Sequence, residues 1–135
     1  MGRTFKAEGI VLKRVNYKEA DRLVTIFTKE FGKLTAVAKG VRRLTSKKRG
    51  SLEPASRAYF YFVEHRSHFI LTQTDLIHSY QTLQQSLVRI AQTYQLLEIV
   101  NLLTVEQQEL PQMYSDLTDT LDRLSEDGQK KDMLI

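Results

Sequence analysis

The sequence predicts an α+β protein: a small five-stranded β-barrel over residues 1–79, followed by an incomplete α-helical segment over residues 80–135. Short strand-forming runs separated by glycine or polar turns fill the first part, and apolar residues take a helical period in the second. The charge divides in the same way. Residues 1–66 hold 16 Lys and Arg against 6 Asp and Glu, a net +10, whereas residues 67–135 hold 4 against 10, a net −6. A basic half of this size indicates a polyanionic partner.

Runs rich in β-branched and aromatic residues predict strands over residues 5–12, 23–28, 34–38, 57–64 and 68–77. We expect a bend in the first strand at Gly9 and a tight turn around Gly32, because glycine tolerates backbone conformations that other residues avoid. Within the fourth strand, Phe60 and Phe62 alternate with tyrosines and are expected in the core. Five short strands in about 75 residues suit a small barrel, and the oligonucleotide-binding (OB) fold has the matching size.

Two helices are expected after the strands. The first covers about residues 80–104 and carries an apolar stripe of Leu83, Leu87, Ile90, Tyr94, Leu97, Val100 and Leu103. A polar break at 106–110 precedes Pro111, which suits a first helical turn. The second stripe is Met113, Leu117, Leu121 and Leu124, with a stop at Gly128. We expect an antiparallel helical hairpin with apolar surface left over. Residues 130–135 look like the start of a further element, and we interpret the chain as truncated there.

Several classes of protein are disfavoured. The chain has no cysteine, so it forms no disulfide and no thiolate zinc site, which is compatible with a reducing cytoplasm. No stretch of about 18 apolar residues predicts a membrane span, and the N-terminus has no apolar signal segment. Phosphate-loop, nucleophile-elbow and zinc-protease motifs are absent, so we expect no enzyme and no cofactor. His65, His68 and His78 are too unevenly spaced for a convincing metal site.

The main functional signal is the run from Lys39 to Gly50, whose six basic residues fall within the eleven positions 39–49. Like charges at this density repel unless solvent screens them or an anion binds. Arginine forks and flexible lysines suit phosphates. The alternatives are a solvated loop and, less favoured, a targeting signal.

Further basic residues lie in or beside the first hairpin and would line one charged face with the loop: Lys13, Arg14, Lys18, Arg22, Lys29 and Lys33. Aromatic side chains add a second way to hold nucleic acid, since unpaired bases stack on them. Tyr59 and Tyr61 share one face of the fourth strand, and Tyr17 falls in the first connecting loop. For each, an ordinary half-buried tyrosine is the alternative.

The order of several short motifs resembles the N-terminal part of the RecO family of bacterial DNA repair and recombination mediators. These are the residues at 9–12, 17–22, 27–33, 38–43 and 46, and the later run 94–98 resembles the family's first long helix. Family proteins continue for roughly another hundred residues, where many carry a zinc element, so zinc binding is not expected of this chain. The family's Gly-Glu in the first loop is Lys18-Glu19 here.

The resemblance implies an OB barrel followed by a helical domain. It also implies binding of single- and double-stranded DNA, annealing of complementary strands and loading of recombinase, with RecR and single-strand DNA-binding protein as partners. A cytoplasmic, nucleoid-associated location follows. The candidate DNA-binding residues are Arg14, Arg22, Lys33, Lys39, Arg42, Arg43, Lys47, Lys48 and Arg49.

Two other hypotheses stay open. In the first, the barrel and hairpin form a protein-interaction adaptor that assembles a repair complex. In the second, the barrel binds RNA.

Overall fold

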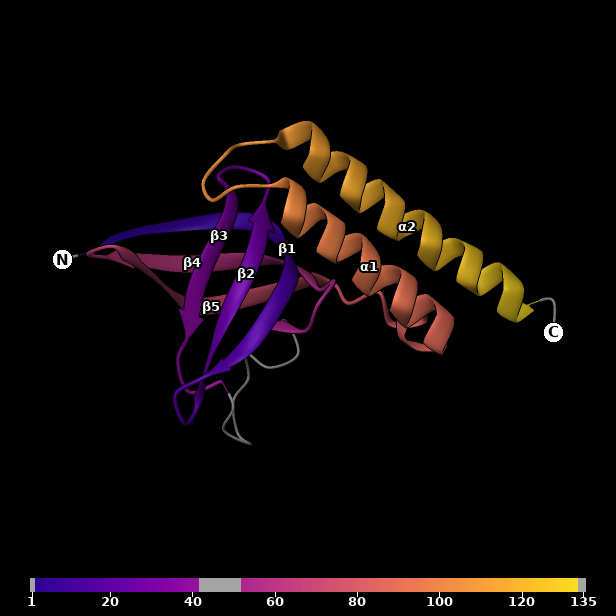
Figure 1. The fold of residues 1–135 in the computed structure, drawn as a ribbon, viewed down its shortest axis with the longest axis horizontal. Helices are drawn as coiled ribbons and strands as arrows, with labels where there is room; N and C mark the ends of the chain where they lie inside the picture. Colours follow the sequence, from indigo (N-terminus) through magenta and orange to yellow (C-terminus); the bar gives the residue numbers. More distant parts are fainter. Residues whose placement is uncertain (1, 42–51, 134–135) are drawn as a thin grey trace.

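The computed structural model describes residues 2–41 and 52–133, with side chains as far as residue 126. Five strands come first: β1 (Arg3–Tyr17), β2 (Asp21–Thr28), β3 (Gly32–Ala38), β4 (Arg57–His65) and β5 (His68–His78). They close into a barrel in the order β1-β2-β3-β5-β4 (Figure 1), in which β3 and β5 are parallel and the other neighbours antiparallel. The closed five-stranded sheet confirms the predicted OB-type barrel.

Strand β1 is much longer than predicted because it serves two neighbours. Its first half pairs with β4 and its second half with β2, and Gly9 takes part in both pairings. The irregularity in the strand falls between Val11 and Lys13, not at the glycine. A side chain at Gly9 would meet Ile26 and the Phe27 carbonyl at 2.7 and 3.0 Å, so the glycine permits close approach of two strands.

The predicted turn between the second and third strands is confirmed. Gly32 has a φ of +72°, a left-handed conformation that costs glycine little. A Cβ atom there would also collide with the backbone of Gln108, which belongs to the segment between the helices. The turn is thus both a chain reversal and a contact with the helical part.

The helical part consists of a 3₁₀ turn, η2 (Gln81–Gln84), and two helices, α1 (Leu87–Leu103) and α2 (Pro111–Met133). The prediction of one helix from residue 80 was wrong, because Tyr80 has a positive φ of 51° and cannot start an α-helix. The helix begins after Ser86, whose side chain accepts a hydrogen bond from the Arg89 N–H at 3.1 Å.

The second helix begins at Pro111, as predicted, but does not stop at Gly128. It runs on to Met133, so most of the segment expected to open a further element belongs to α2 instead. A glycine inside a helix costs only about 1 kcal/mol, which the rest of a long helix outweighs. The two helices lie antiparallel, as expected, and cover one side of the barrel (Figure 1).

Two apolar clusters hold the described part together. The first fills the barrel: Ala7, Val11, Val24, Ile26, Leu34, Ala36, Ala38, Val41, Leu52, Ala58, Phe60, Phe62 and Leu71. The second joins the outer surface of β1 and β2 to the helices: Ile10, Leu12, Phe27, Ala55, Tyr80, Leu83, Leu97, Val100, Tyr114, Leu117 and Leu121. The predicted core role of the two β4 phenylalanines is confirmed.

The first predicted helical stripe was only partly right. Leu83, Leu97 and Val100 are buried, whereas Leu87, Tyr94 and Leu103 are exposed. Periodicity marked the faces of one long ideal helix. The α-helix covers only Leu87–Leu103, and the leucines at its two ends are exposed, whereas Leu83 packs in the second cluster from the 3₁₀ turn before it.

Candidate nucleic-acid interface

One end of the barrel collects the basic residues that the structure describes around the β1–β2 turn. This end, which we call the basic end, contains Arg14, Lys18, Arg22 and Lys39. The β1–β2 turn and the end of β3 come together there (Figure 1). The Gly40 N–H donates to Asp21 Oδ1 at 2.8 Å, which fixes the chain leaving β3 against the start of β2.

Lys39 and Lys18 are the exposed cations of the basic end. Lys18 has a φ of 53°, and its ammonium lies 5.3 Å from the ring centroid of Tyr17. Tyr17 itself is the last residue of β1, paired with Asp21, and not part of the connecting loop as predicted. The turn therefore presents a cation next to a partly exposed aromatic ring, a combination that suits a nucleotide.

The two arginines of the basic end bracket one acidic residue. Arg14 contacts Glu53 Oε2 through Nε and Nη2, both at 3.0 Å, and Arg22 Nη1 lies 3.7 Å from Glu53 Oε1. The side chain of Arg22 is only 12% exposed, so we assign it mainly to stabilising the fold beside Glu53. Sequence reasoning missed Glu53, which lies three residues after the basic run and precedes Pro54. The carboxylate offsets one of the two positive charges.

The candidate residues Arg42, Arg43, Lys47, Lys48 and Arg49 lie outside the described residues. Their flanks are described. Val41 and Leu52, the described residues on either side, are both fully buried in the barrel core. DNA contacts by the basic run remain a prediction.

Lys33 lies away from the basic end, and its side chain is held by hydrogen bonds to the end of α1. Its Nζ donates to the carbonyls of Asn101 and Thr104, at 2.9 and 2.8 Å, and to Asn101 Oδ1 at 3.1 Å. These oxygens belong to the end of α1, where a cation also meets the favourable end of the helix dipole. With Lys29, Lys33 sits at the β2–β3 turn, at the opposite end of β2 from Arg22. The six hairpin cations therefore do not line one face, and we leave Lys33 out of the proposed site.

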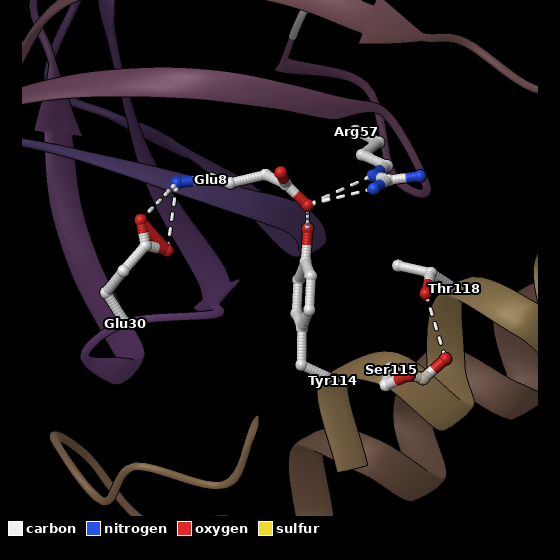
Figure 2. A network of polar contacts seen from close by, with 6 residues as sticks. All are labelled: Glu8, Glu30, Arg57, Tyr114, Ser115 and Thr118. Atoms are coloured by element: carbon white, nitrogen blue, oxygen red, sulfur yellow. Dashed lines mark hydrogen bonds and ion pairs between the residues drawn. The ribbon is translucent and has the colours of Figure 1, made fainter. Parts of the chain in front are cut away.

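A second polar network ties the barrel to α2 (Figure 2). Glu8 Oε2 on β1 accepts hydrogen bonds from the Tyr114 hydroxyl at 2.7 Å and from Arg57 Nη2 and Nε at 3.0 and 3.3 Å. No local sequence pattern predicts this set of contacts, because Arg57 is 49 residues and Tyr114 is 106 residues from Glu8 in the chain. Only the tertiary structure brings the three side chains together, and we call them the Glu8 network.

The Glu8 network perturbs the ionisation of its members. Burial favours the neutral carboxyl, but the hydrogen bonds from Tyr114 and Arg57 and the charges of Arg57 and Lys29 hold the pKa of Glu8 below its usual range. Burial first, and then the Glu8 carboxylate, raise the pKa of Tyr114. The tyrosine thus stays a hydrogen-bond donor and the glutamate an acceptor over the ordinary pH range.

Neither metal ligands nor a membrane span emerge from the described residues. Within 2–41 and 52–133 no three His, Asp or Glu side chains gather as a metal site would require. All three histidines are exposed, and His78 Nδ1 accepts a hydrogen bond from the Tyr80 N–H at 2.8 Å. No helix in this part of the chain is both long and apolar enough to cross a membrane.

The closed five-stranded barrel and its basic end define a basic OB-fold protein. The family model for the N-terminal part of recombination protein O matches residues 1–80. The chain belongs to this family.

Curated relatives agree along most of the chain. It is 39% identical to the DNA repair protein RecO of Moorella thermoacetica, covering 90% of this chain and 46% of that protein. Identity to the RecO proteins of Heliobacterium modesticaldum and Myxococcus xanthus is 35% and 36%, over 76% and 87% of this chain and 37% and 48% of theirs. The chain thus spans about half the length of these relatives.

Proposed function

We propose that this protein binds single- and double-stranded DNA without sequence preference and anneals complementary strands, in DNA repair and homologous recombination. The observation that carries the proposal is the basic end of the OB barrel. Exposed Lys18 and Lys39 lie at this end, and in the sequence Lys39 opens the basic run. The names of the relatives, DNA repair proteins, point to the same process.

The mechanism needs no bond to be made or broken, and we propose a non-catalytic role. Lysines and arginines at the basic end hold phosphates and release the counterions condensed on DNA. The contacts are to the backbone, so they carry no sequence information. Neutralising two strands at once lowers their mutual repulsion, which lets complementary bases meet.

Affinity for DNA is expected to fall linearly with salt on a double-logarithmic scale, with a slope of several phosphates. Fluorescence anisotropy of a labelled single strand measures this directly. The double variant Lys18→Glu/Lys39→Glu should bind about tenfold or more weakly near 0.1 M salt and lose about two units of slope, one for each phosphate contact. Annealing of two complementary strands, followed by energy transfer, should slow in parallel.

The control is Arg123→Glu, a single charge reversal at an exposed position of α2, to be compared with Lys18→Glu and Lys39→Glu taken one at a time. It should leave affinity and slope nearly unchanged. If all three single charge reversals weaken binding equally, the basic end is not the site. If the folded wild-type protein binds no DNA even at low salt, the proposed function itself fails. Tighter binding of RNA than of DNA of the same sequence would favour an RNA-binding barrel.

A second candidate function is that of an adaptor that assembles a repair complex, with RecR and single-strand DNA-binding protein as proposed partners and a nucleoid-associated location. Helix α1 favours it. Leu87, Val88, Leu102 and Leu103 are all more than two-thirds exposed. A hollow of about 510 Å³ between β1 and α1 is lined partly by Leu12, Tyr94 and Leu102. Apolar surface of this kind marks interaction sites.

The adaptor function predicts that immobilised RecR retains this protein at high salt and without DNA. Leu102→Ser should weaken the retention severalfold because it removes apolar contact area, whereas Gln92→Ser, at an exposed polar position of the same helix, should not. Retention that disappears with salt or nuclease would contradict the adaptor function.

A further inference from the structure

Two tyrosines stand side by side on the outer face of β4. Tyr59 and Tyr61 alternate with Phe60 and Phe62, which are fully buried inside the barrel. Tyr59 is 38% exposed and Tyr61 is half-buried. This face pairs with the first half of β1, whereas the basic end is built from the second half. The two tyrosines therefore lie on a different part of the barrel from the basic end.

A lysine on the neighbouring strand stands over both rings. Lys6 is directly opposite Tyr61 in the β1–β4 register. Its Nζ is 4.4 Å from the ring centroid of Tyr59 and 5.6 Å from that of Tyr61. We call Lys6, Tyr59 and Tyr61 the tyrosine shelf. The lysine is exposed on a flexible stem, so it is able to leave the ring faces without disturbing the sheet.

The acidic residues nearest to the shelf in the strand register are occupied. Asp75, opposite Tyr59, accepts from the Tyr61 hydroxyl at 2.9 Å and from Gln73 Nε2 at 3.3 Å. Glu8 accepts from Arg57 and Tyr114. The hydrogen bond to Asp75 orients the ring of Tyr61. Both carboxylates already accept hydrogen bonds from protein groups.

We propose that the tyrosine shelf binds unpaired nucleobases by stacking, with Lys6 contacting the adjacent phosphate. The inference rests on the proposed DNA-binding function and adds a site that distinguishes single strands from duplex. Side chains two residues apart on a strand are about 6.6–6.8 Å apart, roughly twice the 3.4 Å rise between stacked bases. Two such rings therefore accept bases of a strand that has unstacked, and a paired base offers no free face.

The test compares Tyr59→Leu/Tyr61→Leu with wild-type protein, on a single strand and on a duplex at the same salt. Loss of two stacking rings is expected to weaken single-strand binding about 30-fold or more and to leave duplex binding unchanged. A 2-aminopurine base in the single strand reports stacking by its fluorescence, and its signal change on binding should shrink in the double variant.

Two controls separate stacking from damage to the sheet. Tyr59→Phe/Tyr61→Phe keeps both rings and loses the bond to Asp75, so it should bind single strands like wild type. Ile99→Ala shortens an exposed apolar side chain of α1 that belongs to neither proposed site, and it should leave single-strand and duplex binding unchanged.

Three results would overturn the inference. If the folded Tyr59→Leu/Tyr61→Leu variant binds single strands normally, the tyrosine shelf is not a binding site, while the proposed DNA-binding function stands. Equal losses on single strand and duplex show a contact that does not depend on free bases. If wild-type protein binds neither the single strand nor the duplex, the proposed DNA-binding function fails as well.

Discussion

Replacing Glu8 with alanine is expected to lower the free energy of unfolding by about 3 kcal/mol, toward the low end of the range for breaking a buried ion pair. The loss has two sources. Arg57, whose side chain is only 27% exposed, would keep its charge without the carboxylate 3.0 Å away. The Tyr114 hydroxyl would lose the acceptor that ties α2 to the barrel. Urea unfolding followed by circular dichroism measures the difference.

Glu64→Ala is the matched control, since Glu64 pairs with Arg3 at 3.2 Å between the same two strands. Arg3 is 67% exposed there, so water screens the pair and the cost should stay below about 1 kcal/mol. Equal losses in the two variants would mean that the Glu8 network contributes no more than a surface ion pair.

The pH dependence of stability offers an independent check on the same carboxylate. The pKa of Glu8 is lower in the folded protein than in the unfolded chain, so its contribution is present in full above the unfolded value, near 4.3, and is lost as pH falls through the folded value. Glu8→Gln cannot titrate. The stability difference between wild type and this variant should therefore be constant above about pH 5.5 and shrink toward pH 3. A difference that stays constant down to pH 3 would contradict the lowered pKa.

Leu97→Ala is expected to cost about 2–5 kcal/mol, because Leu97 is buried in the cluster between α1 and the barrel and little can collapse into the cavity. Its matched control is Leu103→Ala on the same helix. The helical stripe placed both leucines in the core, but Leu103 is 67% exposed, so its loss should stay within about 0.5 kcal/mol. Thermal unfolding by calorimetry distinguishes the two, and similar losses would favour the simple stripe over the packing described above.

The Leu97 substitution also tests whether helices and barrel unfold together. Barrel residues Ile10 and Phe27 share the second cluster with Leu97. One cooperative transition at a lower temperature is therefore expected for Leu97→Ala. Two separate transitions would show that the helices are held to the barrel more loosely than this shared cluster requires.

Local sequence was enough to predict the features that depend on local physics. β-branched runs located all five strands, alternation placed Phe60 and Phe62 inside the barrel, and Gly32 marked a turn with positive φ. The same reasoning located the two helices and the proline that opens the second. It also singled out the basic run after Lys39, because clustered like charge is visible without a fold.

Only the tertiary structure decided which side chains meet. Lys33 and Arg22 were equal candidates for DNA by charge and spacing, yet one binds the end of α1 and the other lies beside Glu53. The Glu8 network joins residues far apart in the chain, and the tyrosine shelf needs Lys6 from another strand. The physical reason is the same in each case. Charge and periodicity are properties of a segment, whereas burial, ion pairing and stacking depend on neighbours that closure of the barrel brings together.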